Sequence, residues 1–416
     1  MNAAIRQYLV ITGNYWAFTL TDGALRMLVV LHFHQLGYSP LAIALLFVFY
    51  EFFGVVTNLV GGYLGARLGL NRTMNIGLLL QVLALGMLAV PATMLTVPWV
   101  MAAQALSGIA KDLNKMSAKS GIKLLVPGSE QGKLYRWVAI LTGSKNTLKG
   151  IGFFLGGALL VATGFQGAVI AMATALMLVW LSSLVLLSRE LGRSKAKPKF
   201  TDVFSSSRAI NVLSFARLFL FGARDIWFVV ALPVYLHTGF GWDFWQVGGF
   251  MALWVIGYGA IQTLAPTLTR RTAQGLPQRR VAVIWAMLLA GLPAAIALGL
   301  GHGGQDQIVL VGGLLLFGAV FAINSSLHSY LIVSLARADG VSLDVGFYYM
   351  SNAMGRLLGT VLSGWMYQAY GLEACLWVSS AMLVVATVAV ARLPKNLARE
   401  AEESYPGRAQ PTCKSR

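Results

Sequence analysis

Several lysines and arginines lie deep inside long hydrophobic stretches of this sequence, where charged side chains are rare. Counting at 1.5 Å per residue from the ends of those stretches places Lys145 and Arg356 about 17 Å deep, too far for their side chains to reach water. A charge at the bilayer centre costs at least about 2.5 to 3.5 kcal/mol, so such residues face a cavity or a partner and are functional by default. The deep cations are Arg26, Lys111, Lys115, Lys145, Lys149, Arg224 and Arg356. Since they come from distant parts of the chain, we expect them to bind an anion with more than one charged group.

Four acidic residues lie in the same stretches, and they are Asp22, Glu51, Asp112 and Asp225. An intramembrane acid can carry a proton or only neutralise a neighbouring cation. Arg26 lies four residues after Asp22, and Lys115 lies three residues after Asp112. Side chains at these spacings can meet on one helix, so both pairs are candidate ion pairs. The sequence leaves open whether the acids couple to protons or balance charge.

Helical spacing gathers the cations further. Lys111, Lys115 and Lys119 recur every four residues and form one cationic stripe, and Lys145 and Lys149 do the same on a second helix. Like charges at this spacing repel, so an anion or an acid must lie opposite them. The cations that we expect to snorkel instead to the nearer membrane boundary are Lys119, Lys123, Lys133 and Arg136.

One later stretch is polar without being charged, and it contains Asn324, Ser325, Ser326, His328 and Ser329. These side chains could bind the hydroxyl groups of a ligand. Hydrogen bonding between neighbouring helices is the equal alternative.

The composition excludes a water-soluble globule. The chain of 416 residues is 57% hydrophobic and only 11% charged, and its mean hydropathy is +0.69, whereas about a quarter of the residues of soluble domains are charged. Its two cysteines, Cys375 and Cys413, make no disulfide scaffold. We find no cysteine or histidine pair at metal spacing, no nucleophile elbow and no phosphate-binding glycine loop, so we expect no metal, cofactor or catalytic residue. A membrane enzyme remains the remote alternative.

Hydropathy and chain breakers predict an all-α membrane protein with twelve transmembrane helices. The length suits this number, because one span needs roughly 20 apolar residues. The predicted spans cover residues 8–35, 41–65, 73–91, 97–119, 134–162, 167–188, 211–236, 244–268, 281–299, 308–334, 345–369 and 374–393.

The loop cations all fall on one side of this arrangement. Connections such as 34–40 and 238–243 contain no lysine or arginine, whereas the opposite connections hold Arg67, Arg72, Lys123, Lys133, Arg136, Arg193, Lys195, Lys197, Lys199, Arg208, Arg270, Arg271, Arg279 and Arg280. By the positive-inside rule that side is cytoplasmic, and both termini lie there. We expect the basic stretch 189–210 to be a cytoplasmic linker rather than a nucleic-acid patch, and 394–416 to be a disordered cytoplasmic tail.

An internal repeat divides the spans into two six-helix, pseudo-symmetric halves, 1–188 and 211–393. Residues of the fifth span recur by class in the eleventh at an offset of about 207, so that Lys149 corresponds to Arg356 and Gly152 to Gly359. Parallel halves of this kind are typical of the major facilitator fold.

The connection after the second span resembles the cytoplasmic signature of that superfamily, in which glycines surround an acid and a base. Its glycines and base are Gly62, Arg67 and Gly69, which we expect to form a gating loop. Ala66 occupies the acidic position, so the charge latch usually credited to that acid is absent from this pattern.

The chain from about Tyr8 to Leu393 resembles the ArsJ family of organoarsenical efflux permeases within the major facilitator superfamily. The segment FGARDIWFVVALPVY contributes to the resemblance, and the specific segments are QALSGIAKDLNKMSAKSGIKLLVP and GSKNTLKGIGFFLGG. The resemblance implies export of 1-arseno-3-phosphoglycerate and arsenate resistance. The functional partner is then glyceraldehyde-3-phosphate dehydrogenase, which makes this compound when it uses arsenate. The resemblance implies no physical contact between that enzyme and this protein. We expect a monomer in the bacterial inner membrane. The residues themselves indicate only an anion, and leave both its identity and the energy coupling open.

Overall fold

The computed structural model describes residues 3–38, 46–127, 130–187, 207–273, 279–301, 305–337 and 340–394. Within these ranges every regular element is helical. The elements are α1 Ala3–Gln35, α3 Val48–Leu68, α4 Leu70–Leu88, the 3-10 turn η1 Ala92–Met94, α5 Val97–Leu125, α6 Gln131–Leu186, α7 Arg208–Phe228, α8 Ala231–Phe240, α9 Phe244–Ala273, α10 Arg279–Gly299, α11 Asp306–Leu335 and α12 Val341–Ala391.

Two of these helices are each a pair of spans. In α6 the backbone leaves the helical region at Gly164, with φ 69° and ψ 178°, and in α12 it does so at Gly371, with φ 79° and ψ −176°. Glycine adopts positive φ without steric cost, so the chain can turn there within very few residues. With α7 and α8 taken as one span, the described residues form twelve helical segments, as the sequence predicts. Six of the described helical units are long and apolar enough to cross a membrane by length and composition alone.

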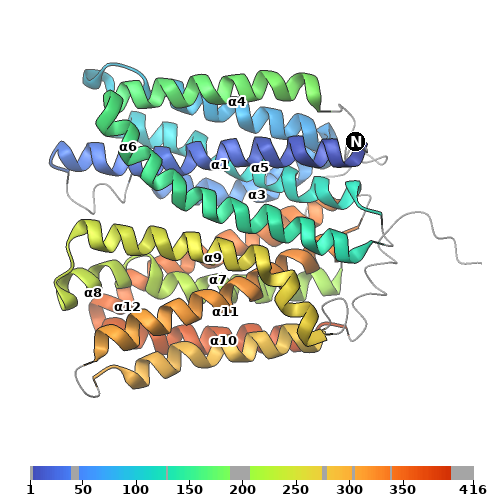
Figure 1. Ribbon diagram of the computed structural model, residues 1–416, viewed down its shortest axis with the longest axis vertical. Coiled ribbons are helices and arrows are strands. Elements are labelled where there is room, and N and C mark those ends of the chain that lie inside the picture. Colours follow the sequence, from blue (N-terminus) through green and yellow to red (C-terminus); the bar gives the residue numbers. More distant parts are fainter. Residues whose placement is uncertain are drawn as a thin grey trace, which may run out of the picture.

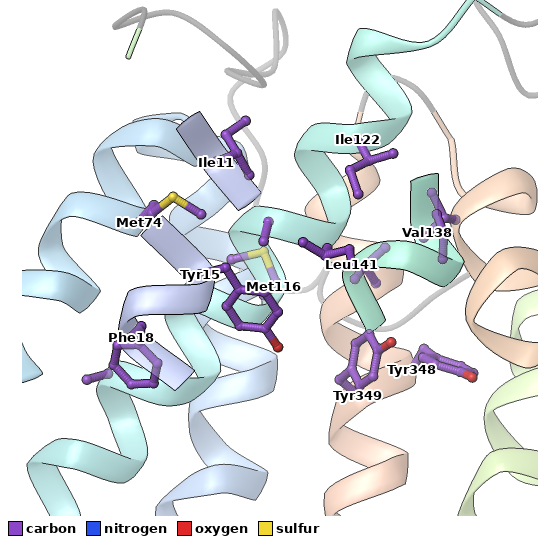
Figure 2. Close-up of a cluster of buried hydrophobic side chains, with 14 of the residues drawn as sticks. Ile11, Tyr15, Phe18, Met74, Met116, Ile122, Val138, Leu141, Tyr348 and Tyr349 are labelled. Carbon is purple, nitrogen blue, oxygen red and sulfur yellow. The ribbon is translucent and has the colours of Figure 1, made fainter. Parts of the chain in front are cut away.

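The helices form two bundles that lie side by side (Figure 1). One contains α1 to α6 and the other α7 to α12. They meet where α3 packs on α12 and α6 packs on α9. Figure 2 shows buried side chains of both bundles in one hydrophobic cluster, with Tyr15 and Met116 on one side and Tyr348 and Tyr349 on the other.

The junction of α3 and α4 differs from the expected gating loop. Helix α3 continues to Leu68 and α4 begins at Leu70, so Gly62 and Arg67 are helical and only Gly69 joins the two. The Gly69 amide closes α3 on the carbonyl of Gly65 at 3.0 Å, and its φ of 94° reverses the chain. The prediction of a loop over this segment is wrong because one glycine with positive φ suffices for the turn.

Parts of two expected segments lie outside the described residues. The linker 189–210 is described only from Ser207, whose hydroxyl accepts a hydrogen bond from the amide of Ile210 at 3.4 Å and so caps α7. Helix α7 therefore begins at Arg208 rather than at 211. Of the tail 394–416 only its first residue is described.

The two bundles touch closely near the end at which α1 begins, which we call the N-terminal end. There Gly62 of α3 crosses Gly346 of α12. A Cβ atom on Gly346 would lie 2.6 Å from the carbonyl oxygen of Asn58 and 2.9 Å from Cα of Gly62. Such approach needs glycine on both helices, as is common where membrane helices pack backbone to backbone. This crossing closes the bundle at the N-terminal end.

We expect Gly346→Ala to force α3 and α12 apart. Overpacking of this kind costs about 1 to 3 kcal/mol, so the detergent-purified variant should melt at a clearly lower temperature than the unchanged protein. Gly364→Ala is the matched control, because Gly364 lies on the same helix with no atom within 4 Å of an added Cβ. Equal melting temperatures for the two variants would contradict the crossing.

Candidate functional site

A cluster of charged side chains occupies the middle of the structure, where both bundles meet. It contains the seven deep cations and the four acids of the sequence analysis. We call it the central cluster, and it comprises Asp22, Arg26, Glu51, Lys111, Asp112, Lys115, Lys145, Lys149, Arg224, Asp225 and Arg356. Because α1, α3, α5 and α6 belong to one bundle and α7 and α12 to the other, the cluster bridges the two halves.

Glu51 connects the bundles directly. Its Oε1 atom accepts hydrogen bonds from Nη2 of Arg26 at 3.2 Å and from Nη2 of Arg356 at 3.1 Å. Arg26 lies on α1 and Arg356 lies on α12, so one carboxylate oxygen joins a cation from each half. The Glu51 and Arg356 side chains are 30% and 29% exposed, so solvent reaches this pair.

Asp225 continues the chain of charges into the second bundle. Its Oδ1 atom lies 2.5 Å from Nη2 of the neighbouring Arg224, and its Oδ2 atom accepts a bond from Nε of Arg356 at 3.1 Å. The Asp225 side chain is completely buried. A continuous path of ion pairs therefore crosses the interface, and it runs through Arg224, Asp225, Arg356, Glu51 and Arg26.

Asp22 takes partners other than the expected one. It accepts a hydrogen bond from the Tyr50 hydroxyl at 2.7 Å and lies 3.8 Å from Nζ of Lys149. The candidate pair of Arg26 with Asp22 is therefore wrong. Asp22 is buried among residues of neighbouring helices, whereas the Arg26 guanidinium extends to α3 and lies 4.8 Å from the ring centre of Tyr50.

Asp112 behaves as expected and neutralises the lysine stripe of α5. It forms an ion pair with Lys115, and Nζ of Lys111 lies 3.9 Å from its other oxygen. Lys111 also sits over the ring of Tyr50 at 3.8 Å, a cation–π contact that ties α5 to α3.

Lys145 differs from the other cations of the cluster. In the part of the chain that the structure describes, it takes part in no ion pair or hydrogen bond, although it is only partly exposed. The central cluster holds seven cations against four carboxylates, a formal excess of three positive charges. A site with this balance is suited to an anion and unsuited to a cation.

The expected snorkelling of four cations is half right. Lys133 is partly exposed and pairs with Glu130 at 2.8 Å, and Arg136 is exposed. Lys119 and Lys123 are instead fully buried. The prediction fails for them because α11 and α12 of the other bundle cover that face of α5, and position along α5 does not report this cover.

Sequence reasoning also missed Arg217 of α7, which is 2% exposed. It precedes Arg224 by seven residues, two turns on the same helix face, and this spacing was the signal that could have found it. Its partners include Ser325, a member of the polar stretch in α11. Asn324 of that stretch bonds the carbonyl of Trp285 at 2.8 Å, which is a contact between helices. No group of three or more possible metal ligands occurs among the described residues.

Comparisons with known proteins agree with this architecture. The model of the Major Facilitator Superfamily matches residues 9–343. No curated protein matches the sequence significantly. Among solved structures, the E. coli fucose:proton symporter is similar at a TM-score of 0.72 with 13% identity over 94% of this chain and 98% of that one.

Two further solved structures are similar. A human organic anion transporter has a TM-score of 0.71 and 18% identity over 94% of this chain and 100% of its own. A bacterial homologue of the iron transporter ferroportin, in an outward-facing state, has a TM-score of 0.73 and 15% identity over 94% and 98%. At these identities the likeness shows the fold alone.

We expect Asp225→Asn to destabilise the protein strongly, because it leaves Arg224 without a carboxylate and Arg356 with Glu51 alone. Removing one partner of a buried ion pair typically costs about 3 to 5 kcal/mol. Thermal unfolding of the purified variants measures this effect. Glu373→Gln, at an exposed position of α12, is the control. If both variants melt at the same temperature, Asp225 does not hold the two arginines.

Proposed function

Because the chain belongs to the Major Facilitator Superfamily, we propose that it is a secondary transporter that exports a phosphorylated organic anion. Membership makes it a multi-pass membrane transporter and not an enzyme. The substrate class is our inference from the central cluster. Three observations support it, namely the excess of positive charge, the unpaired cation at Lys145 and the convergence of both bundles.

The excess of three positive charges is the observation on which the proposal chiefly rests. A drug or metal cation would be repelled by seven lysines and arginines, whereas a phosphorylated acid would supply the missing negative charge. The arginines offer planar donor pairs that fit phosphate or carboxylate oxygens, and the lysines act as mobile point charges. Arg26 and Arg356 lie on opposite bundles, so one multivalent anion can contact both.

Alternating access follows from the same arrangement. An anion that enters the cluster competes with Glu51 for Arg26 and Arg356. When it binds, the oxyanion of the substrate replaces the Glu51 carboxylate as the partner of both arginines. The loop cations gather at the N-terminal end, so we assign that end to the cytoplasm. The crossing of Gly62 and Gly346 closes it, and the solvent-reached pair of Glu51 and Arg356 supports access from the opposite side. We therefore infer an outward-facing arrangement.

The membrane potential favours export of such a substrate. An inside-negative potential of 100 mV contributes about 2.3 kcal/mol per charge, so an anion that leaves with two or three charges gains about 5 to 7 kcal/mol. Proton coupling is then not obligatory. Proton antiport through Asp22 or Glu51 is the second candidate mechanism, and it is favoured by the position of Glu51 between two arginines, where protonation would release both.

For the substrate itself we propose 1-arseno-3-phosphoglycerate, on the basis of the ArsJ resemblance. This compound has an oxyanion at each end and fits a cluster that draws cations from two bundles. The enzyme that must supply it is a glyceraldehyde-3-phosphate dehydrogenase that accepts arsenate. Another organophosphate of similar charge is the alternative.

We expect Lys145→Ala, Lys149→Ala and Arg356→Ala each to lower transport by at least about tenfold, because each removes a charge-assisted contact to the anion. The assay is uptake of labelled 3-phosphoglycerate, a stable probe, into inverted vesicles that contain equal amounts of each variant. Lys133→Ala is the matched control, since Lys133 lies on the same helix outside the cluster. Full uptake by Lys149→Ala and Arg356→Ala would rule out the cationic site.

We expect the transporter to confer arsenate resistance only in cells that also make the organoarsenical, because arsenate alone is too small to contact cations of both bundles. The measurement is growth on arsenate with and without an arsenate-using glyceraldehyde-3-phosphate dehydrogenase. Undiminished resistance without that enzyme would eliminate this substrate. The vesicle assay would then remain as the test of whether the protein transports any phosphorylated organic anion.

A further inference from the structure

A second layer of buried polar residues lies between the central cluster and the N-terminal end. Its two cations are Lys119 of α5, 3% exposed, and Arg217 of α7, 2% exposed. They belong to opposite bundles. Along their helices they lie about 6 Å from Lys115 and about 10 Å from Arg224, so this layer adjoins the central cluster on its N-terminal side. Tyr349 lies at the boundary, because Lys115 and Lys119 are each 4.8 Å from its ring centre.

The partners of Lys119 come from the other bundle. Its ammonium group donates to the Tyr349 hydroxyl and lies 3.5 Å from Oγ of Ser329. It also sits 4.8 Å from the ring centre of Tyr349. Figure 2 shows Tyr349 where the helices of the two bundles meet. Tyr349 therefore covers this lysine on the side of α12.

Arg217 is likewise held by neutral groups. Its Nε atom donates to Oδ1 of Asn352 at 3.1 Å, and its Nη1 atom donates to Oγ of Ser325 at 3.3 Å. The guanidinium lies 4.0 Å from the ring centre of Phe221 and 5.2 Å from that of Tyr348. Hydroxyl, amide and aromatic groups thus take the place of a carboxylate.

The layer has no counter-ion of its own. None of the ion pairs found in the described ranges includes Lys119 or Arg217, in contrast to the central cluster, where four carboxylates are paired. Burying two cations without an acid is unfavourable, and a bound anion would reduce this cost. The neutral partners accept hydrogen bonds from Lys119 and Arg217 but do not compensate the two positive charges.

The buried polar atoms of α11 and α12 that have no hydrogen-bond partner within the described part of the chain include Nδ1 of His328 and the Tyr348 hydroxyl. His328 precedes Ser329, and Tyr348 precedes Tyr349. The Tyr348 ring lies 5.2 Å from the Arg217 guanidinium, so its unpartnered hydroxyl is a donor that an anion bound there could accept from.

We propose that Lys119 and Arg217 form a second anion site, covered in this conformation, that opens to the cytoplasm when the two bundles separate at the N-terminal end. The site receives the phosphoryl group of the substrate before the central cluster does, and Ser325, Ser329 and Tyr349 supply hydroxyl donors. It rests on the proposed function, because its ligand is the exported anion. In the closed arrangement the Tyr349 hydroxyl occupies the position beside Lys119 that an anion oxygen would take.

The test measures apparent affinity separately at the two membrane faces. Uptake of labelled 3-phosphoglycerate into inverted vesicles gives KM at the cytoplasmic face, and exchange in right-side-out vesicles gives KM at the outer face. Lys119→Met and Arg217→Gln should raise the cytoplasmic KM by about tenfold or more and leave the outer KM within about twofold.

If these residues had a purely structural role, the cytoplasmic KM would change in the opposite direction. If Lys119 only fastened α5 to α12, its loss would favour the cytoplasm-open state and lower the cytoplasmic KM. Lys123→Met provides that comparison, because Lys123 donates to the carbonyl of Ser334 at 2.6 Å and joins α5 to α11 one turn nearer the end. An unchanged or lower cytoplasmic KM for both Lys119→Met and Arg217→Gln would overturn the second site.

The same vesicles separate the two proposals. Central variants such as Lys149→Ala should lose transport at both faces, and Lys133→Met should retain both KM values. If the unchanged protein transports the probe but the Lys119 and Arg217 variants keep their cytoplasmic KM, the second site fails and the proposed function stands. If the unchanged protein transports no phosphorylated anion, the proposed function and the second site both fail.

Discussion

Charge buried within a membrane must be matched, and this requirement governs how the two helix bundles meet. The acids available in the middle of the structure number fewer than the cations, so Glu51 and Asp225 are each shared between two arginines. Sharing draws α3 toward α12 and couples α7 to the same helix. A substrate anion would supply the missing negative charge. The charge balance of the site is therefore also the basis of the proposed anion transport.

Backbone packing holds the two bundles together near the N-terminal end, outside the central cluster. Long cationic side chains bridge the bundles in the middle, but closure near the N-terminal end depends on direct contact between Gly62 and Gly346. Lys119 and Lys123 reach across the same region to hydroxyl and carbonyl groups. Glycine contacts are short in range and are lost at once when helices part, whereas ionic contacts weaken gradually. A structure with both kinds of contact can close firmly at one end and still rearrange at its centre.

Much of this could be predicted from the sequence, and the failures share one cause. Hydropathy predicts twelve spans, and the charged residues selected by their depth along each helix lie together in the structure. Both are local properties. The partner of Arg26, the burial of Lys119 and the importance of Arg217 depend on which helix lies opposite, and no spacing within one helix reports that. Likewise the short turn at Gly69 follows from a single backbone angle rather than from composition.

The central claim is that a surplus of positive charge selects a multivalent anion. Calorimetric titration of the purified protein with glycerate, 3-phosphoglycerate and 2,3-bisphosphoglycerate tests it most directly, because these ligands share a carbon skeleton and differ in charge. We expect no measurable binding of glycerate and at least about tenfold tighter binding of the phosphorylated acids, and we expect salt to weaken that binding. Equal affinity for all three ligands, or preference for glycerate, would contradict it.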